Sequence, residues 1–278
     1  MTVDFHLHLV SDSTGETIAA MSRACLAQFS DVECREHVWN MIRSPRLLQT
    51  VIDGIQKNRG LVLYTFVDEE LRAQLESFCR DNDIPCVSVL RPVLAGMAAL
   101  FGKNPSHMPG RQHILDEGYF ARIDAMDFAL AQDDGHGIDR LQDADVVILG
   151  VSRTSKTPTC VYLAGRGIRA ANIPFVPGHL MPDELKQLKK PLIVGLTKDA
   201  DSLVAIRRNR LHLLSENRET SYVDPEKVRE ELQEARRFFA RLGCPVIDVS
   251  RRSIEETAAE IMTLLAQRKE AISQSGSL

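Results

Sequence analysis

The sequence predicts an α/β fold with a mainly parallel sheet flanked by helices. Two observations carry this prediction. Short runs rich in Val, Ile and Leu alternate along the chain with amphipathic helical patterns, which is the order of a βαβ fold. Several runs are apolar on both faces, as parallel strands buried between two layers of helices are. The expected strands are 5–11, 32–39, 61–67, 86–90, 145–151, 173–177, 191–197 and 245–250.

Helix-start signals stand between the expected strands. Ser44 and Asp224 each precede a proline, and an N-cap followed by proline is a common first turn. Asp68 is a further N-cap, ahead of the helical segment EELRAQLESF. Ser253 and Glu256 have capping-box spacing, in which each side chain bonds the other residue's backbone N–H. The last two helices each carry an apolar stripe that fits a core or a dimer interface: Val228, Leu232, Ala235, Phe239 and Leu242 in one, and Ile254, Ala258, Ile261 and Leu265 in the other.

An irregular stretch in the middle of the chain marks a domain boundary. Residues 101–113 contain Gly, Pro and polar residues without periodicity, so we place a boundary near 102–112. This divides the chain into an N-terminal α/β lobe, 1–105, and a C-terminal lobe, 106–278. The tail SQSGSL is expected to be frayed, and no internal sequence repeat is found.

The composition is that of an ordinary globular protein and gives no argument for a nucleic-acid partner. The chain has 278 residues, of which 44% are hydrophobic and 26% charged, and its formal net charge is −4. This mildly acidic balance does not favour a polyanion. Arginine clusters stand among acids or beside an apolar stripe, so we interpret them as solvated helix faces: Arg207, Arg208 and Arg210; Arg236 and Arg237; Arg251 and Arg252.

Cysteine spacing and the length of the apolar runs predict a soluble cytoplasmic protein. None of the six cysteines forms a C-x-x-C pair, which disfavours a structural zinc site or a redox motif. No signal peptide is recognised, so the thiols are expected to be reduced. The longest apolar runs fall far short of the ~20 residues that cross a bilayer, so no membrane partner is expected.

The segment GVSRTSKTPTC, Gly150–Cys160, follows an apolar strand and is close to the phosphate-loop pattern G-x-x-x-x-G-K-[ST]. Backbone N–H groups in such a loop converge on an anion, and the dipole of the next helix adds to the attraction. Lys156 would reach the terminal phosphate, and Thr157 would offer its hydroxyl to Mg²⁺. The C-terminal lobe is therefore expected to be a P-loop, kinase-like nucleotide-binding lobe, although a polar turn without a ligand is the alternative. The other expected nucleotide contacts are Gly150, Val151, Ser152, Arg153, Thr154 and Ser155.

Two residues of this segment bear on its conformation. Ser155 stands where the pattern has a glycine, and serine adopts left-handed backbone angles only at a cost. Pro158 suits the first turn of a helix, where its missing N–H is not needed. Its position predicts that the helix begins near Thr157.

A second hydroxyl-rich corner, VSDSTGET, follows the first expected strand. Ser13 and Glu16 have capping-box spacing, and Gly15 stands in the turn. Ligands of open α/β sheets bind at the carboxyl ends of the strands, where Asp12 lies. Simple helix capping is the equally weighted alternative. The helix after the corner is expected to turn Ile18, Met21, Cys25 and Phe29 inward.

Three other groups are weaker candidates. His6 and His8 share one side of the first strand, but no third metal ligand stands nearby, so core or surface histidines are favoured. The tandem acids Asp133 and Asp134 fit a carboxylate pair for base or metal chemistry, although Asp-Asp-Gly more often forms a turn. Asp248 ends an apolar strand and fits either a magnesium ligand or a helix cap. No Ser/His/Asp or Cys/His hydrolase signature is recognised.

Five motifs taken together resemble those of the bacterial pyruvate, phosphate dikinase regulatory proteins, from about residue 5 to about residue 268. The motifs are SDSTGET, RIDAMDFALAQDDG, GVSRTSKTPTCVYLA, ANIPFVPG and SIEETAAEI, in this order. A sister branch regulates phosphoenolpyruvate synthase and typically has an SDGTA-like first motif and Cys-Gly in place of Thr154-Ser155. This chain is more similar to the dikinase branch.

The resemblance implies a bifunctional serine/threonine kinase and phosphorylase. Members of the family phosphorylate and inactivate a dikinase threonine with ADP as donor, when the neighbouring catalytic histidine of the dikinase is phosphorylated. They also remove that phosphate by phosphorolysis, with inorganic phosphate as acceptor and pyrophosphate as product. The resemblance makes Gly150 to Thr157 the ADP-binding segment. The same chemistry on phosphoenolpyruvate synthase, or a nucleotide sensor without catalysis, are the alternatives.

Phosphoryl transfer needs positioning and charge neutralisation more than covalent chemistry. Lys156 and Arg153 are therefore expected to contact the transferring phosphoryl group, with Thr157 on Mg²⁺. Asp12 and Asp134 are the candidates for the base that accepts the proton of the threonine hydroxyl. The corner from Ser11 to Thr17 is expected to hold the second phosphate or the phosphothreonine. A homodimer is a further expected partner.

Overall fold

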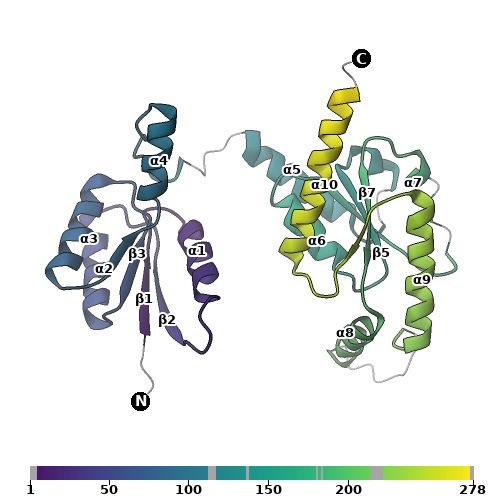
Figure 1. The fold of residues 1–278 in the computed structure, drawn as a ribbon, viewed down its shortest axis with the longest axis horizontal. Coiled ribbons are helices and arrows are strands. Elements are labelled where there is room, and N and C mark those ends of the chain that lie inside the picture. Colours follow the sequence, from purple (N-terminus) through teal and green to yellow (C-terminus); the bar gives the residue numbers. More distant parts are fainter. Residues whose placement is uncertain are drawn as a thin grey trace. The chain divides into compact units, whose positions relative to one another are not determined.

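The computed structural model describes residues 5–111, 117–135, 138–179, 181–182, 184–213 and 222–275. The chain forms two compact units, Met1–Ile114 (unit 1) and Leu115–Leu278 (unit 2), each with its own sheet (Figure 1). Parts of the irregular stretch, of the DDGHG turn and of the C-terminal tail lie outside the described residues.

Unit 1 has a four-stranded parallel sheet in the order β2-β1-β3-β4. Helix α1 lies on one face of this sheet, and α2 and α3 cover the other face (Figure 1). Its elements are β1 (Phe5–Val10), α1 (Glu16–Leu26), β2 (Cys34–Trp39), α2 (Pro45–Lys57), β3 (Leu61–Tyr64), α3 (Glu69–Asp81), β4 (Cys86–Ser88) and α4 (Arg91–Phe101).

Unit 2 has a second four-stranded parallel sheet, in the order β6-β5-β7-β8. All eight expected strands are present, and β6 begins three residues earlier than expected. The elements are α5 (Glu117–Ala131), η2 (Asp133–Gly135), η3 (Ile138–Asp143), β5 (Val146–Gly150), α6 (Lys156–Ala164), β6 (Ala170–Pro174), α7 (Glu184–Gln187), β7 (Leu192–Thr197), α8 (Ala200–Leu213), α9 (Pro225–Leu242), β8 (Val246–Asp248) and α10 (Ile254–Ser275).

The two units repeat one topology, although the sequence shows no repeat. In each sheet the first strand of the unit lies between the second and the third, and the fourth strand lies at the edge beside the third. The chain therefore winds in one direction from the first strand and then in the other. Such a reversal opens a crevice at the carboxyl ends of the two central strands. Unit 1 has this point between β1 and β3, and unit 2 has it between β5 and β7.

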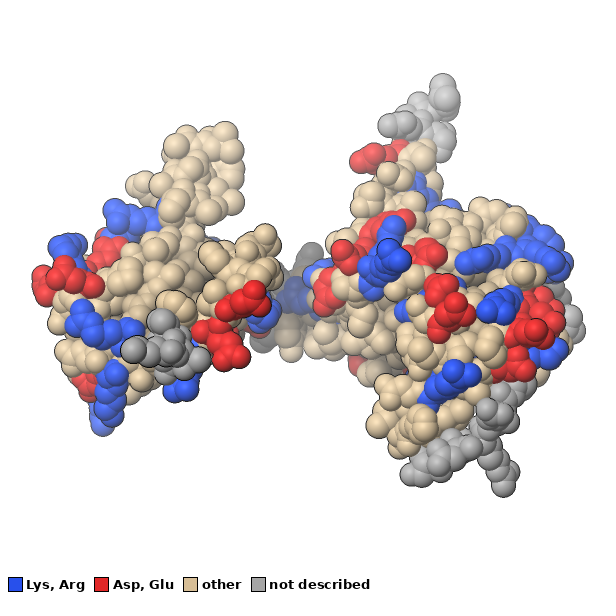
Figure 2. Space-filling view, turned by 60° about the horizontal axis from the view of Figure 1, so that its bottom comes forward, with Lys and Arg blue, Asp and Glu red and all other residues tan. Residues whose placement is uncertain are grey.

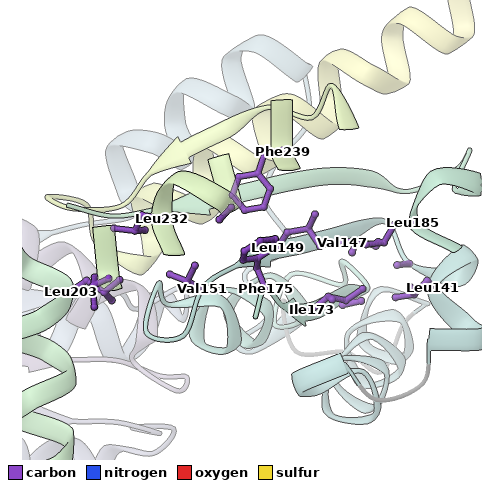
Figure 3. Close-up of a cluster of buried hydrophobic side chains, with 14 of the residues drawn as sticks. Leu141, Val147, Leu149, Val151, Ile173, Phe175, Leu185, Leu203, Leu232 and Phe239 are labelled. Atoms are coloured by element: carbon purple, nitrogen blue, oxygen red, sulfur yellow. The ribbon is translucent and has the colours of Figure 1, made fainter. Parts of the chain in front are cut away.

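The apolar stripes of the last two helices belong to the core of unit 2. Helix α9 packs on one face of the sheet, where Phe239 lies beside Val147 and Leu149, and Leu232 lies toward Val151 (Figure 3). Helix α10 packs on the opposite face together with α6. Gly195 allows the close approach of α9, because a Cβ there would lie 2.5 Å from the Phe239 ring. Tertiary packing thus accounts for these stripes without a dimer interface.

The predicted helix caps are confirmed at four helices and wrong at α1. The side chains of Ser44, Asp68 and Asp224 each accept backbone N–H groups of their helices. Ser253 and Glu256 form the reciprocal bonds of a capping box, 3.1 and 2.8 Å long.

Helix α1 begins in another way. Its N-cap is Gly15, in the left-handed region at φ 80°, and no side chain caps the helix. Cys25 and Phe29 are exposed instead of buried, since α1 ends at Leu26 and turns Ile18 and Ser22 toward the sheet. The buried Ser22 hydroxyl donates a 2.6 Å hydrogen bond to Glu36.

Surface and thiol chemistry agree with the expected globular class. On the faces visible in Figure 2, lysine and arginine lie among aspartate and glutamate in both units. All six cysteines are free thiols. Within the described residues, no helix combines the length and the apolar character needed to span a bilayer.

Candidate functional site

The Gly150 loop lies at the point where the chain of unit 2 reverses its winding. Strand β5 is central in the sheet and buried along its whole length, because its Val, Ile and Leu side chains pack against helices on both faces. It ends at Gly150, and α6 begins at Lys156 after a loop of five residues. The helix starts one residue before the expected position, with Pro158 in its first turn. The loop and the helix N-terminus therefore face the crevice of the sheet.

Ser155 retains the backbone conformation for which phosphate loops use glycine. It is the N-cap of α6 at φ 63° and ψ 24°, in the left-handed region, and Arg153 has φ 72°. A left-handed serine costs free energy that the surrounding structure must supply. Gly150 is sterically required, since a Cβ there would lie 2.6 Å from Thr154 Oγ1 and 3.0 Å from the Leu196 carbonyl oxygen.

Internal hydrogen bonds hold the loop in a tight turn. The Val151 carbonyl accepts hydrogen bonds from Thr154 Oγ1 at 2.9 Å and from Lys156 Nζ at 3.1 Å. Both donor side chains are buried, and Thr154 is fully so. The Thr154 hydroxyl is therefore used within the loop, while Lys156 folds back beneath it and still borders the cavity described below.

Lys156 is a buried cation with nearby carboxylates. Its side chain is only 6% exposed. Burial lowers the pKa of the ammonium group from 10.5 to about 8, and the charges of Asp134 and Asp133 oppose this shift. The favourable charge interactions do not fully replace lost hydration. A buried ammonium group of this kind attracts an anion, because the anion would compensate for the hydration that the charge has lost.

Thr157 forms a polar network with the turn that precedes β5. Its hydroxyl donates a 2.9 Å hydrogen bond to Asp133 Oδ1. The side-chain amide of Asn172, on β6, donates to the same Asp133 oxygen at 2.6 Å and to Thr157 Oγ1 at 2.9 Å. The same amide nitrogen lies 3.4 Å from Asp134 Oδ1. The structure thus brings the tandem acids of the DDGHG segment to the Gly150 loop.

A cavity of about 320 Å³ opens above this arrangement. Hydroxyl, ammonium, guanidinium and carboxylate groups line it together with a small apolar wall, so it can accept a polar anion and a cation beside it. Gly150, Val151 and Thr154 shape the loop without lining the cavity. The lining residues are Asp134, Ser152, Arg153, Ser155, Lys156, Thr157, Pro158, Pro174 and Ile206.

Arg207 supports the loop from α8, where sequence analysis placed a solvated charge. Its side chain is 1% exposed, so that interpretation was wrong for this arginine. The guanidinium forms a paired ion bridge to Glu231, at 2.7 and 3.0 Å, and donates to the Ser152 carbonyl at 3.1 Å. It also stacks on the Tyr222 ring, whose hydroxyl lies 3.1 Å from Ser152 Oγ. Arg207 therefore joins the loop to α8 and α9.

The remaining sequence candidates lie elsewhere. Asp12 belongs to unit 1, whereas the cavity above is lined by residues of unit 2. Asp248 ends the edge strand β8 and accepts hydrogen bonds from Ser250, as a turn residue does. It does not line the cavity.

Of the paired histidines, His8 lies in the core of unit 1 and His6 is half-buried. His8 is fully buried, accepts the Trp39 indole N–H at 3.1 Å and donates to the Asn58 carbonyl at 2.7 Å. His6 lies 3.0 Å from His37. Among the described residues no group of three or more His, Cys, Asp or Glu is arranged to hold a metal ion.

Sequence reasoning missed Asn172 and Arg207 for different reasons. Asn172 left a weak signal, since it is the one polar side chain in the buried strand β6, Ala170–Pro174. Arg207 left none, because its neighbours Arg208 and Arg210 have the same type and only packing separates them. Asp133 was recognised as part of a tandem pair, but its bond to Thr157 depends on tertiary structure.

The lowered pKa of Lys156 predicts a pH-dependent cost in stability. The folded-state pKa of about 8 lies below the ordinary 10.5, so the unfolded chain binds more protons between these values. The contribution of Lys156 to the free energy of unfolding therefore rises as the pH rises from 8 to 10.5. We expect Lys156→Met to be more stable than the parent by about 3 kcal/mol at pH 7. The gain should shrink toward pH 10.5 in urea unfolding, whereas the exposed control Lys190→Met should show no such trend. An equal or lower stability of Lys156→Met at pH 7 would contradict this prediction.

Comparison with known proteins shows the family to which this chain belongs. The kinase/pyrophosphorylase family model matches residues 7–262, which span both loops and both sheets. The chain belongs to the kinase/pyrophosphorylase family. The match extends over both units, so the family is defined by the pair of them and not by the Gly150 loop alone.

Relatives in this kinase/pyrophosphorylase family share about half of their residues with the chain. A protein of Paramagnetospirillum magneticum is 54% identical over 267 residues, which cover 96% of this chain and 86% of the relative. A protein of Rhodospirillum rubrum is 54% identical over 260 residues, or 94% of each chain. A third, from Caulobacter vibrioides, is 53% identical over 262 residues, or 94% of this chain and 83% of the relative. All three carry the name pyruvate, phosphate dikinase regulatory protein.

Proposed function

We propose that this protein is a bifunctional regulator of pyruvate, phosphate dikinase. In the forward reaction a dikinase threonine hydroxyl attacks the β-phosphorus of ADP, which forms phosphothreonine and releases AMP. In the reverse reaction inorganic phosphate attacks the phosphothreonine, which restores the hydroxyl and releases pyrophosphate. The first reaction inactivates the dikinase and the second activates it.

The observation that carries the proposal is the junction of β5, the Gly150 loop and α6 in a chain of the kinase/pyrophosphorylase family. The cavity at this junction holds a buried ammonium group beside half-buried hydroxyl residues and an exposed carboxylate. Phosphoryl transfer is catalysed mainly by such positioning and charge neutralisation. The names of the relatives support the dikinase as the protein substrate.

The three charged side chains of the cavity have roles in this proposal. Lys156 and Arg153 neutralise the oxygens of the transferring phosphoryl group, and the helix N-terminus adds its dipole. Asp134 accepts the proton of the threonine hydroxyl, since it is exposed and lines the same cavity. Asp12 is a second candidate for this base. Its pKa is raised by burial, which favours proton acceptance, and it belongs to unit 1.

Mg²⁺ fits the oxygen groups of Thr157, which lines the cavity, and of Asp133, which accepts the Thr157 hydroxyl. The ion is held in phosphoryl-transfer sites by one or two protein oxygens together with nucleotide phosphates and water. Thr157 Oγ1 and Asp133 Oδ1 lie 2.9 Å apart, and Asp134 adjoins them. When bound, the ion would offset charge on the phosphates. Thr157 and Asp133 would hold it.

The proposal also includes a cellular location and a homodimer. The protein is placed in the cytoplasm in this proposal, because the six free thiols suit a reducing compartment. A homodimer remains part of the proposal. The described part of α4 has no buried residue, and Val93, Met97, Leu100 and Phe101 are exposed apolar side chains there.

The test is transfer of label from ADP that carries ³²P in its β-phosphoryl group. The full chain is incubated with this ADP, phosphoenolpyruvate and purified dikinase, and in a parallel reaction with phosphoenolpyruvate synthase. We expect label on a dikinase threonine, and its conversion to pyrophosphate when inorganic phosphate is added. Label on the synthase alone would replace the dikinase as substrate. ADP binding without transfer to either protein would indicate a nucleotide sensor and overturn the proposed activity.

A further inference from the structure

The corner between β1 and α1 has the same construction as the Gly150 loop. In each unit the first strand is followed by a loop of five residues, 11–15 or 151–155, and then by a helix. The last loop residue is left-handed in both, Gly15 at φ 80° and Ser155 at φ 63°, and no side chain caps either helix. Both loops lie where their sheet reverses its winding. Unit 1 thus has a second crevice of the kind that binds ligands.

The crevice of unit 1 contains a cavity of about 180 Å³. Ser11, Ser13 and Thr17 border it at the end of β1 and the start of α1, and Thr65 borders it at the end of β3. This volume is sufficient for a tetrahedral oxyanion with a bridging water. The hydroxyl groups around it are donors of the kind that phosphoryl oxygens accept.

Ser13 has a hydroxyl without a partner. Its Oγ atom is buried from solvent and makes no hydrogen bond with the described part of the chain. A buried hydroxyl that lacks a partner costs free energy unless a ligand or water satisfies it. Ser13 lines the cavity, so the missing partner would lie inside it. The Gly150 loop, by comparison, satisfies its buried Thr154 hydroxyl internally.

Cationic groups stand beside the unpartnered hydroxyl. A Cβ built on Gly110 would lie 3.3 Å from Arg43 Nη2 and 3.8 Å from Ser13 Oγ, so the guanidinium and the hydroxyl both approach Gly110, although Arg43 does not itself line the cavity. Arg43 is fixed by a 2.9 Å hydrogen bond from Nε to the Asp12 carbonyl. Arg111 lines the same cavity. Arginine presents several N–H donors in a plane, which suits a phosphoryl group.

The carboxylates at the corner are engaged in other interactions or lie at the rim. Asp12 Oδ2 accepts the Val67 N–H at 2.7 Å and the Asp68 N–H at 3.4 Å, so it holds the loop after β3. Burial raises the pKa of Asp12, while the hydrogen bonds from the Val67 and Asp68 amides stabilise its charged form. Glu16 also lines the cavity, in the first turn of α1, and is exposed to solvent that screens its charge.

We propose that the β1–α1 corner of unit 1 binds a tetrahedral phosphoryl group, either free orthophosphate or the phosphate of a phosphothreonine. Ser13 Oγ, Arg43 and the N-terminal amides of α1 are its donors. Its use as a reactant site in the reverse reaction rests on the proposed function. The binding itself does not depend on that activity.

The test follows amide signals of the ¹⁵N-labelled full chain by NMR during titration with potassium phosphate at constant ionic strength, and separately with a phosphothreonine tripeptide. Both titrations use the Lys156→Ala background, which weakens anion binding at the Gly150 loop, and the residue-specific signals separate the two loops. We expect saturable shifts at residues 13–17. The double variant Ser13→Ala, Arg43→Gln should weaken binding about tenfold or more, because it removes one hydroxyl donor and one charged donor.

Matched substitutions nearby separate binding from folding. Ser77→Ala with Arg46→Gln removes the same groups from exposed positions outside the cavity and should leave the affinity within twofold. Arg43→Lys retains the charge and should lie between the parent and the double variant. Saturation by the tripeptide but not by phosphate would assign the site to phosphothreonine, and the reverse result to orthophosphate. No saturable shift at 13–17 with either probe, or equal affinity in the double variant, would overturn the inference. Because the readout is binding, loss of label transfer from ADP leaves it intact.

Discussion

Replacement of Lys156 by alanine is expected to reduce label transfer from ADP to the dikinase by about 10³-fold. The lysine is 6% exposed and borders the cavity above the Gly150 loop. Its charge acts in a setting with little water, where a positioned donor stabilises developing phosphoryl charge more strongly than in solution. The substitution leaves the Thr154 bond to the Val151 carbonyl in place, so the loop is expected to keep its turn.

The measurement compares initial rates of threonine labelling at saturating ADP, together with thermal unfolding of each variant. Lys190→Ala provides a matched control, because that lysine is exposed in the same unit and does not border the cavity. Its rate should remain within twofold of the parent. A Lys156→Ala protein that unfolds normally and transfers label at more than a tenth of the parental rate would remove Lys156 from the proposed catalytic groups.

Arg207→Ala is expected to destabilise unit 2 by about 3–5 kcal/mol, the usual cost of breaking one partner out of a buried ion pair. The variant leaves Glu231, which is 14% exposed, without its bidentate partner. It also removes the donor to the Ser152 carbonyl and a cavity-filling side chain. Urea unfolding of the full chain, monitored by far-UV circular dichroism, measures this loss of stability.

Two further variants separate the effect of the Arg207–Glu231 ion pair from the effect of the Arg207 hydrogen bond to the Ser152 carbonyl. Arg208→Ala, the exposed neighbour on α8, should change stability by less than ~0.5 kcal/mol. The double variant Arg207→Met, Glu231→Leu should recover most of the stability, because an apolar pair can replace a buried ion pair. Its label transfer should stay reduced, since Ser152 still lacks the guanidinium. Equal stability of Arg207→Ala and Arg208→Ala would show that the buried bridge contributes little.

At Ser155 the sequence departs from the phosphate-loop pattern, but the backbone keeps the conformation that the pattern implies. By the phosphate-loop pattern this position requires glycine, and serine stands there as an apparent exception. The structure gives Ser155 the left-handed φ of 63° that the pattern implies. Gly15 has the matching conformation in unit 1. The loop shape is therefore set by the strand, the helix and the internal bonds to Val151, and it tolerates the cost of the serine.

At Ser13 and Glu16 the sequence matches the capping-box pattern, but the structure does not form the box. Its spacing is that of a capping box, and the same spacing at Ser253 and Glu256 does form one. At the first site the chain turns through Gly15 and the helix begins at Glu16, two residues later than a box capped by Ser13 would begin it. The Ser13 hydroxyl is left facing a cavity. A local pattern could not distinguish the two sites, because the difference arises from the loop that β1 and β2 impose.

Local chemistry in the sequence was sufficient for the α/β class, the eight strands and most helix starts. These features depend on side chains within a few positions of each other, such as Ser44 beside Pro45 and the apolar run that forms β5. Tertiary structure alone decided that Arg207 is buried, that Thr157 bonds Asp133, and that one topology occurs twice. Each of these depends on residues far apart in the chain that meet only when parallel strands align their carboxyl ends at one edge of a sheet.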